Sequence, residues 1–207
     1  MTSTHRTALA AGAFVVGVAL CGGTGYHPAF ALTPASPAVS VSGVGRGDPG
    51  VGEPFTIATS KTTFSVTVDS VTCGALDARI MTAFFDSIGE PPTPPPPQPG
   101  HQWCVLQVHA LNTGHVNDAW FVGSSAVLGA GQDSYKADTT SDGFTIGQAY
   151  ENSNHGKGPE NGLNPHESGP DWAAYQLPTG TVPSSVTVAN GDLGSGPGSV
   201  VVTLRHS

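Results

Sequence analysis

The sequence predicts an all-β antiparallel sandwich, and three observations lead to that prediction. Short runs in which apolar and polar residues alternate recur along the chain, as expected of half-buried strands. Glycine and proline are abundant, with 28 Gly and 18 Pro among 207 residues, and they gather between those runs, where they form turns. Two of the three cysteines follow an export signal, which indicates a disulfide-containing domain outside the cytoplasm.

Residues 1–31 have the pattern of a secretory signal peptide. A basic start at Arg6 precedes the apolar run 8–20, and the stretch closes at 29–31 with Ala-Phe-Ala, a small-x-small cleavage site. We therefore expect cleavage after Ala31, and a secreted or extracytoplasmic product.

Two alternatives for the N-terminus stay open. A lipoprotein signal would anchor the chain through Cys21, although Leu20 stands where such signals prefer Gly, Ala or Ser. An uncleaved anchor is less favoured, because the apolar run has about 13 residues and a spanning helix needs about 20. We expect no stable membrane span once the signal is removed.

The mature chain divides into a linker and one domain. Residues 32–54 are rich in Pro, Gly and Ser, which predicts a flexible linker. Residues 55–207 are enough for one domain of ordinary size, and the stretch 89–100 forms a proline-rich loop within it. Seven prolines lie between Pro91 and Pro99, and such a run adopts stiff, extended polyproline II. Runs of this kind can be ligands for aromatic grooves, but we favour a rigid surface loop.

The first strands are predicted at 55–59 and 64–73. Phe64, Val66 and Val68 share one face of the second strand, because side chains repeat every two residues. A bulge near 69–70 would bring the end of this strand, with Cys73, to the same inward face. Residues 76–88 fit either a short amphipathic helix or a loop that covers a sheet edge.

The strongest strand candidate is 103–112. It places Cys104 and every second residue after it on one face, and Trp103 on the other. Asn112 at its end can bond backbone groups that would otherwise be unpaired. Weaker strand candidates follow at 121–128, 134–137, 144–149, 172–177, 186–189 and 200–204. Seven or eight short strands without a long helix predict an immunoglobulin-like sandwich.

Three pieces of the chain resemble one family. They are 104–114, which ends in Asn-Thr-Gly; 163–168, with sequence Leu-Asn-Pro-His-Glu-Ser; and 175–180, with sequence Tyr-Gln-Leu-Pro-Thr-Gly. Together they resemble the immunoglobulin-like domain family of unknown function found in bacterial lipoproteins and secreted proteins. The chain is more remotely similar to the secreted immunoglobulin-like immunoprotective antigen of mycobacteria. His166 stands where that family has glycine. The resemblance implies an extracytoplasmic β-sandwich and transfers no catalytic residue.

Cys73 and Cys104 are predicted to form a disulfide, because they are the pair left in an exported chain and both point into one core. The alternative is a metal site, since His101, His109 and His115 lie near Cys104. Cys104 and His109 lie on opposite faces of one strand, however, and a zinc site needs a second pair of ligands at suitable spacing. We therefore expect no metal and no cofactor.

Composition and motifs limit the function. Seven basic against fifteen acidic residues give a net charge of −8, which argues against nucleic acid as a partner. No nucleophile elbow or other catalytic motif is present, so we expect a binding module without catalysis. Its partner would be an envelope or extracellular protein or a glycan. A hydrolase without a recognisable motif and a structural or antigenic surface protein are the alternatives.

Three residues form the candidate ligand site. The proline-rich loop leads directly into His101 and Trp103, and Trp103 lies on the face opposite the disulfide. A rigid loop that includes Pro95 would thus stand beside an aromatic side chain. The simpler interpretation, which we favour, is that Trp103 packs beneath the loop.

Overall fold

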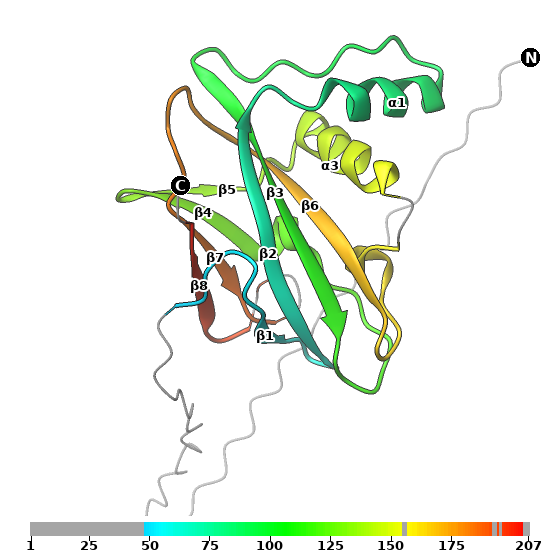
Figure 1. Ribbon diagram of the computed structural model, residues 1–207, viewed down its shortest axis with the longest axis vertical. Coiled ribbons are helices and arrows are strands. Elements are labelled where there is room, and N and C mark those ends of the chain that lie inside the picture. Colours follow the sequence, from blue (N-terminus) through cyan, green and yellow to red (C-terminus); the bar gives the residue numbers. More distant parts are fainter. Residues whose placement is uncertain (1–47, 155–156, 192–193, 195, 205–207) are drawn as a thin grey trace, which may run out of the picture. The chain divides into compact units, whose positions relative to one another are not determined.

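The computed structural model describes residues 48–154, 157–191, 194 and 196–204. Within them, eight strands form two antiparallel four-stranded sheets, which confirms the predicted sandwich (Figure 1). The first sheet has the order β1 (Phe55–Ala58), β2 (Thr63–Gly74), β3 (His101–Asn112) and β6 (Ser168–Pro178). The second has the order β5 (Asp133–Lys136), β4 (Ala126–Ala130), β7 (Ser185–Ala189) and β8 (Ser199–Thr203).

Residues 76–88 contain a helix, one of the two structures that the sequence allowed. Helix α1 (Ala78–Ile88) begins where the Asp77 side chain accepts hydrogen bonds from the backbone N–H groups of Arg79 and Ile80. It ends at Gly89, whose φ of 73° lies in the left-handed region that glycine enters without strain. The helix buries Met81, Phe84 and Phe85.

A second helix occupies a segment where the sequence predicted a strand. Residues 144–149 lie in α3 (Ser141–Ser153), so that prediction was wrong. Ile146 and Ala149, three residues apart, are buried on one side of this helix. Likewise, 121–128 is not one strand: a short turn of helix, α2 (Val122–Ser125), precedes β4. A one-turn 3₁₀ helix, η1 (Pro159–Asn161), completes the helical elements of the described residues.

The sheet of β1, β2, β3 and β6 is covered on both sides. One side faces the second sheet and forms the sandwich core, which includes Phe64, Leu106 and Tyr175. The other side lies beneath α1 and α3, where Trp103 and Trp172 belong to a second cluster with helix side chains (Figure 1). The alternation of β3 therefore follows the sequence prediction, with Cys104, Leu106, Val108 and Ala110 in the sandwich core.

The disulfide joins neighbouring strands of one sheet. The register between β2 and β3 shifts between Val68 and Ser70, which confirms the predicted bulge. After the shift, Cys73 lies opposite Cys104, with 4.0 Å between their Cα atoms, and the two sulfurs are bonded.

Backbone pairing starts before the predicted domain boundary at residue 55. Gly50 bridges to Thr203 of β8, and the Gly52 N–H donates to the Val68 carbonyl at 2.9 Å. The last residues of the expected 32–54 linker are thus held by both sheets. The predicted signal peptide 1–31, with Cys21, and the predicted linker up to residue 47 lie outside the described residues. Among the described helices, none is long and apolar enough to cross a bilayer.

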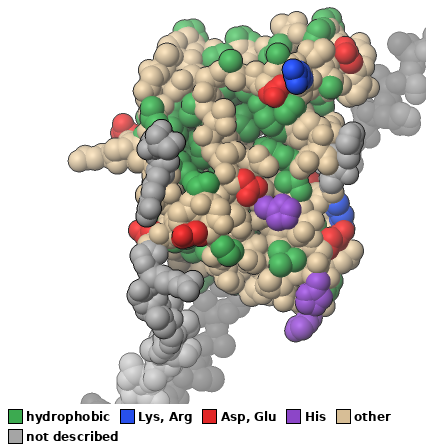
Figure 2. Space-filling model, in the orientation of Figure 1, with side chains coloured by type: hydrophobic (Ala, Val, Ile, Leu, Met, Phe, Trp, Pro, Cys, Tyr) green, Lys and Arg blue, Asp and Glu red, His purple; other side chains and the backbone are tan. Residues whose placement is uncertain are grey.

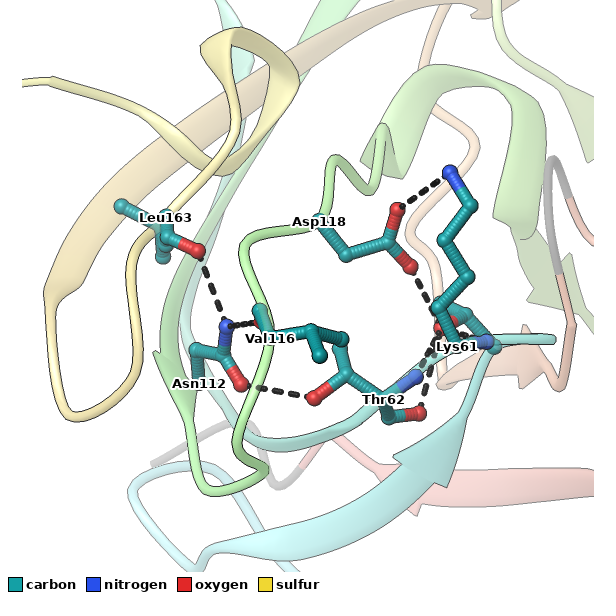
Figure 3. A network of polar contacts seen from close by, with 7 residues as sticks. Lys61, Thr62, Asn112, Val116, Asp118 and Leu163 are labelled. Atoms are coloured by element: carbon teal, nitrogen blue, oxygen red, sulfur yellow. Dashed lines mark hydrogen bonds and ion pairs between the residues drawn. The ribbon is translucent and has the colours of Figure 1, made fainter.

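Asn112, at the end of β3, connects three loops through its side chain (Figure 3). Its amide donates to the carbonyls of Val116 and Leu163, each at 2.8 Å. Its oxygen accepts from the Thr62 hydroxyl at 2.9 Å and from the Gly114 N–H at 3.0 Å. The side chain therefore satisfies loop backbone groups that the sheet does not pair, as the sequence predicted.

The backbone of Asn112 holds the turn that contains His166. The His166 N–H donates to the Asn112 carbonyl at 2.8 Å, and the Asn112 N–H donates to the Glu167 carbonyl at 3.0 Å. His166 has a φ of 66°, in the left-handed region, and is the only non-glycine residue in the described part of the chain with a positive φ. The turn thus keeps the backbone conformation that glycine favours.

We predict that Asn112→Ala lowers the free energy of unfolding by about 2–4 kcal/mol, because several partly or fully buried groups lose their partner at once. Chemical denaturation followed by circular dichroism measures this change. The exposed Asn152→Ala is the matched control and should change the value by less than about 0.5 kcal/mol. Equal effects of the two substitutions would contradict the role of Asn112.

We predict that replacing both Cys73 and Cys104 by Ala lowers the free energy of unfolding by roughly 3–4 kcal/mol. The bond closes a loop with a sequence separation of 31, and the chain-entropy model gives a stabilisation of that size. Thermal melts of the exported parent and of the double variant test this value. Intact-mass analysis of the unreduced parent should show the loss of two hydrogens, and two free thiols would contradict the prediction.

Candidate functional site

The side chain of Trp103, which the sequence offered as part of an aromatic ligand site, is buried in the structure. The side chain is only 2% exposed, and its indole N–H donates to the Pro95 carbonyl at 2.9 Å. Trp103 is thus a buried anchor of the proline-rich loop, which is the simpler of the two predicted interpretations. His101 is half-buried at the start of β3, and its Nδ1 lies 3.2 Å from the Pro99 carbonyl. These residues lie together as predicted, but the ring of Trp103 is not open to a ligand.

Three carboxylates that sequence analysis did not select come together beside β6. Glu151 lies in the last turn of α3, Glu160 in η1 and Asp171 in β6. One oxygen from each lies within 4.8 Å of the oxygens from the other two. Asp171 is completely buried and accepts hydrogen bonds from the backbone N–H groups of Val122 at 2.7 Å and Trp172 at 2.8 Å.

A cavity of about 130 Å³ lies next to this cluster, between α3, α2 and β6. Its walls carry three aromatic side chains, Phe121, Phe144 and Trp172, and two carboxylates, Asp138 and Glu151. The ring of Phe144 is 60% exposed, which is unusual for a phenylalanine. Glu151 belongs both to the cavity wall and to the carboxylate cluster, so the two features are continuous.

Burial and mutual repulsion favour the protonated forms of the clustered carboxyl groups. Burial, and then the negative charge of Glu160, raises the pKa of Glu151 from 4.5 to about 7. Burial also raises the pKa of Glu160. The pKa of Asp171 lies well above its usual range, mainly because of burial, although the Val122 N–H favours the ionised form. Glu151 also faces the negative end of the α3 dipole, where an anion is unfavourable.

Asp138 differs from these groups because its carboxylate accepts several hydrogen bonds from the protein. Burial by itself would raise its pKa, but hydrogen bonds from the Thr140 side chain, from Gln176 and from the Thr140 backbone lower it overall. Asp138 therefore stays ionised at neutral pH. The cavity thus has one permanent negative charge and a second, on Glu151, that appears near neutrality.

This arrangement is suited to binding a positive charge. Aromatic faces attract cations, and carboxylates accept hydrogen bonds from ammonium or guanidinium groups. Carboxylates are also ligands of hard metal ions, but Ca²⁺ takes six to eight oxygens, and the cluster brings together one oxygen from each of three carboxyl groups. An acidic cluster of this size does not by itself define a metal site. The wall residues instead favour an organic cation with an apolar part.

One member of the cluster, Asp171, could have been predicted from the sequence. Asp171, Ala173, Tyr175 and Leu177 alternate along β6, and the last three lie in the sandwich core. Extension of that alternation by two residues places Asp171 on a buried apolar face, where a carboxylate is unusual. Glu160 and Glu151 gave no such signal, because only the folded chain brings η1 and the end of α3 beside β6.

Similarity to known proteins is found among solved structures. No family model matches the chain, and no match is found among curated proteins. Among solved structures, the secreted protein MPT63 of Mycobacterium tuberculosis is similar at 10% identity, with 77% of this chain and 98% of that chain covered and a TM-score of 0.46. The yjhA protein of Bacillus subtilis is similar at 13% identity, with 76% and 99% covered and a TM-score of 0.45.

An uncharacterised β-sandwich protein of Clostridium difficile 630 is also similar, at 11% identity, with 78% of this chain and 97% of that chain covered and a TM-score of 0.39. Identities of 10–13% transfer no residue role to this chain. The resemblance to the domain family of unknown function stays a prediction.

We predict that Glu151 makes the protein less stable as the pH rises. The folded chain holds the Glu151 proton more tightly than the unfolded chain, because the pKa is about 7 when folded and 4.5 otherwise. This contribution to stability is fully present below pH 4.5 and is lost as the pH rises through about 7. Chemical denaturation of the parent and of Glu151→Gln at pH 4.5, 6 and 7.5 measures the contribution of Glu151 to the free energy of unfolding.

The free energy of unfolding of Glu151→Gln, measured relative to the parent, should rise from pH 4.5 to 7.5. The amide is uncharged at both pH values, whereas the carboxyl group of the parent loses its stabilising effect as the pH rises. Glu90→Gln, at an exposed position, is the matched control and should follow the parent. If Glu151→Gln follows the parent as well, the pKa of Glu151 is not raised.

Proposed function

We propose that the chain is an exported binding module without catalysis, and that its cavity between α3 and β6 takes the cationic end of a basic side chain on an extracellular protein. The cavity carries this proposal, because it combines aromatic walls with two carboxylates in one small pocket. Export is part of the proposal and is supported by the Cys73–Cys104 disulfide, a bond typical of oxidising compartments.

The size of the cavity favours a single side chain over a larger ligand. Pockets that bury a drug-sized molecule measure about 300–1,000 Å³, whereas this cavity measures about 130 Å³. One Lys or Arg side chain from a partner's surface could enter it while the rest of the partner stays outside. Phe144, which is largely exposed, would then contact the apolar part of the entering side chain.

The carboxylates account for a preference for positive charge. Asp138 is held ionised by Thr140 and Gln176, so it offers a fixed charge at the cavity wall. Glu151 would lose its proton when a cation enters, because an opposite charge nearby lowers the pKa of a carboxyl group. Binding should therefore release a proton below about pH 7 and be tighter above that pH.

We predict that N-acetyl-lysine amide or N-acetyl-arginine amide binds to the exported protein and that N-acetyl-norleucine amide, which lacks the charge, does not. Isothermal titration calorimetry at pH 8 measures the affinities. Phe144→Ala and Glu151→Gln should each weaken binding of the basic probe about fivefold to tenfold, the loss expected for one cation–π contact or one charge-assisted hydrogen bond of about 1–1.4 kcal/mol.

Two substitutions outside the cavity are the matched controls: Val182→Ala, at an apolar side chain that is 59% exposed, and Asp133→Asn, at an exposed carboxylate. Neither should change the affinity. Equal binding of the norleucine probe would reject the charge-based mechanism. Binding of a neutral chito-oligosaccharide instead of the basic probes would favour a glycan partner and overturn the proposal.

A hydrolase is the second candidate, and one observation favours it. A carboxyl group with a pKa of about 7 in a cavity can act as a general acid near neutral pH. Release of nitrophenol from p-nitrophenyl glycosides or esters, lost in Glu151→Gln, would establish an enzyme and replace the binding proposal. The carboxyl groups nearest to Glu151 are those of Glu160 and Asp171. Burial raises the pKa of both and so disfavours the ionised form that a nucleophile needs, and we therefore expect no turnover.

A further inference from the structure

We propose that residues 93–98 of the proline-rich loop 89–100 form a preformed polyproline II ridge that docks into an aromatic-lined groove, with a basic rim, of another protein. This surface lies between α1 and β3 in the chain and runs beside α1 (Figure 1). It is an interaction surface in its own right, and the argument for it does not depend on the cavity at Glu151.

The sequence restricts the ridge to an extended backbone. Each residue from Thr93 to Pro96 precedes a proline and is therefore excluded from helical conformation. Each proline also has a fixed φ near −65°. A turn with a bond from the Thr93 N–H to the Pro91 carbonyl, at 2.7 Å, precedes the ridge. A second turn follows, with a bond from the His101 N–H to the Gln98 carbonyl at 2.9 Å.

The folded domain holds the ridge at two points. The buried Trp103 of β3 donates its indole N–H to the Pro95 carbonyl at 2.9 Å. The Gln98 N–H donates to the side-chain oxygen of Gln176, in β6, at 2.7 Å. Anchors from two neighbouring strands keep the ridge in one place on the domain. A partner would therefore meet a segment whose conformational entropy is already lost, which is the main advantage of polyproline recognition.

The other side of the ridge is open. Pro95 is half-buried against its anchor, whereas Pro94 and Pro96 are exposed. No described residue donates to the carbonyl of Pro94 or of Pro96, so both remain free acceptors. The bond from Trp103 to Pro95 shows which contact this backbone accepts: an indole N–H donates to the carbonyl of a residue that precedes a proline. A groove lined with Trp and Tyr would offer the same contact to the open side.

Neighbouring side chains define the rim of the partner's groove. The exposed carboxylates of Asp86 and Glu90 lie at the end of α1, just before the ridge, and Ile88 between them is 50% exposed. Hydrophobic side chains gather on the upper half of the face in Figure 2, where a basic side chain stands beside an acidic one. A groove with aromatic floor and basic rim complements this surface in both shape and charge.

The test uses three domains that bind polyproline II through aromatic grooves: an SH3, a WW and an EVH1 domain, each labelled with ¹⁵N and titrated with the full exported chain. We expect saturable NMR shifts at the aromatic groove of at least one domain. The double substitution Pro94→Ala/Pro96→Ala, at exposed positions that do not carry an anchor, should weaken that binding at least tenfold. Pro54→Ala, an exposed proline outside the ridge, is the matched control and should bind like the parent.

A synthetic peptide of residues 89–100 tests the preformed conformation. It should bind the same groove more weakly than the folded chain, because it lacks the anchors from Trp103 and Gln176. Absence of binding by all three domains overturns the proposal, as does an unchanged affinity of the Pro94→Ala/Pro96→Ala chain. Binding of the peptide as tight as that of the folded chain rejects the preformed ridge.

Discussion

Burial of strand β3 on both faces is the constraint on which the rest of the domain depends. Leu106 and Val108 enter the core between the two sheets, whereas Trp103 and Val105 lie under the helices. A strand with two apolar faces needs cover on both, so the sandwich requires a third layer. Trp103 or Trp172 alone removes roughly 150–250 Å² from water, and that area is equivalent to about 4–6 kcal/mol of hydrophobic stabilisation.

The same two-residue alternation in β6 places a carboxyl group where water cannot reach it. Asp171 follows the register of Ala173 and Tyr175 and so points to the buried side. The N–H groups of Val122 and Trp172 offset part of the cost of burial, and the bond from Val122 also attaches α2 to this strand. Glu151 and Glu160 then add charge of the same sign, which is why the cavity beside them favours a cation or a proton.

Both proposed binding surfaces are built on the β3–β6 pair. The cavity lies where α3 packs beside β6, and the ridge depends on Trp103 and Gln176, which belong to β3 and β6. The disulfide fixes β3 to β2 close to where the ridge joins the sheet. A rigid sheet with loops and helices attached to one face is a common way to position a binding site.

The sequence by itself determined the sandwich, the disulfide pair, the bulge before Cys73 and the role of Asn112, because each depends on local alternation, chain order or the chemistry of one side chain. Tertiary structure decided the helix at 144–149, where burial of Ile146 and Ala149 against β3 and β6 overrides a weak strand pattern. It also decided that Trp103 is buried beneath the proline loop. The carboxylate cluster exists in the fold alone, since residues 151, 160 and 171 meet through long-range packing that no local pattern encodes.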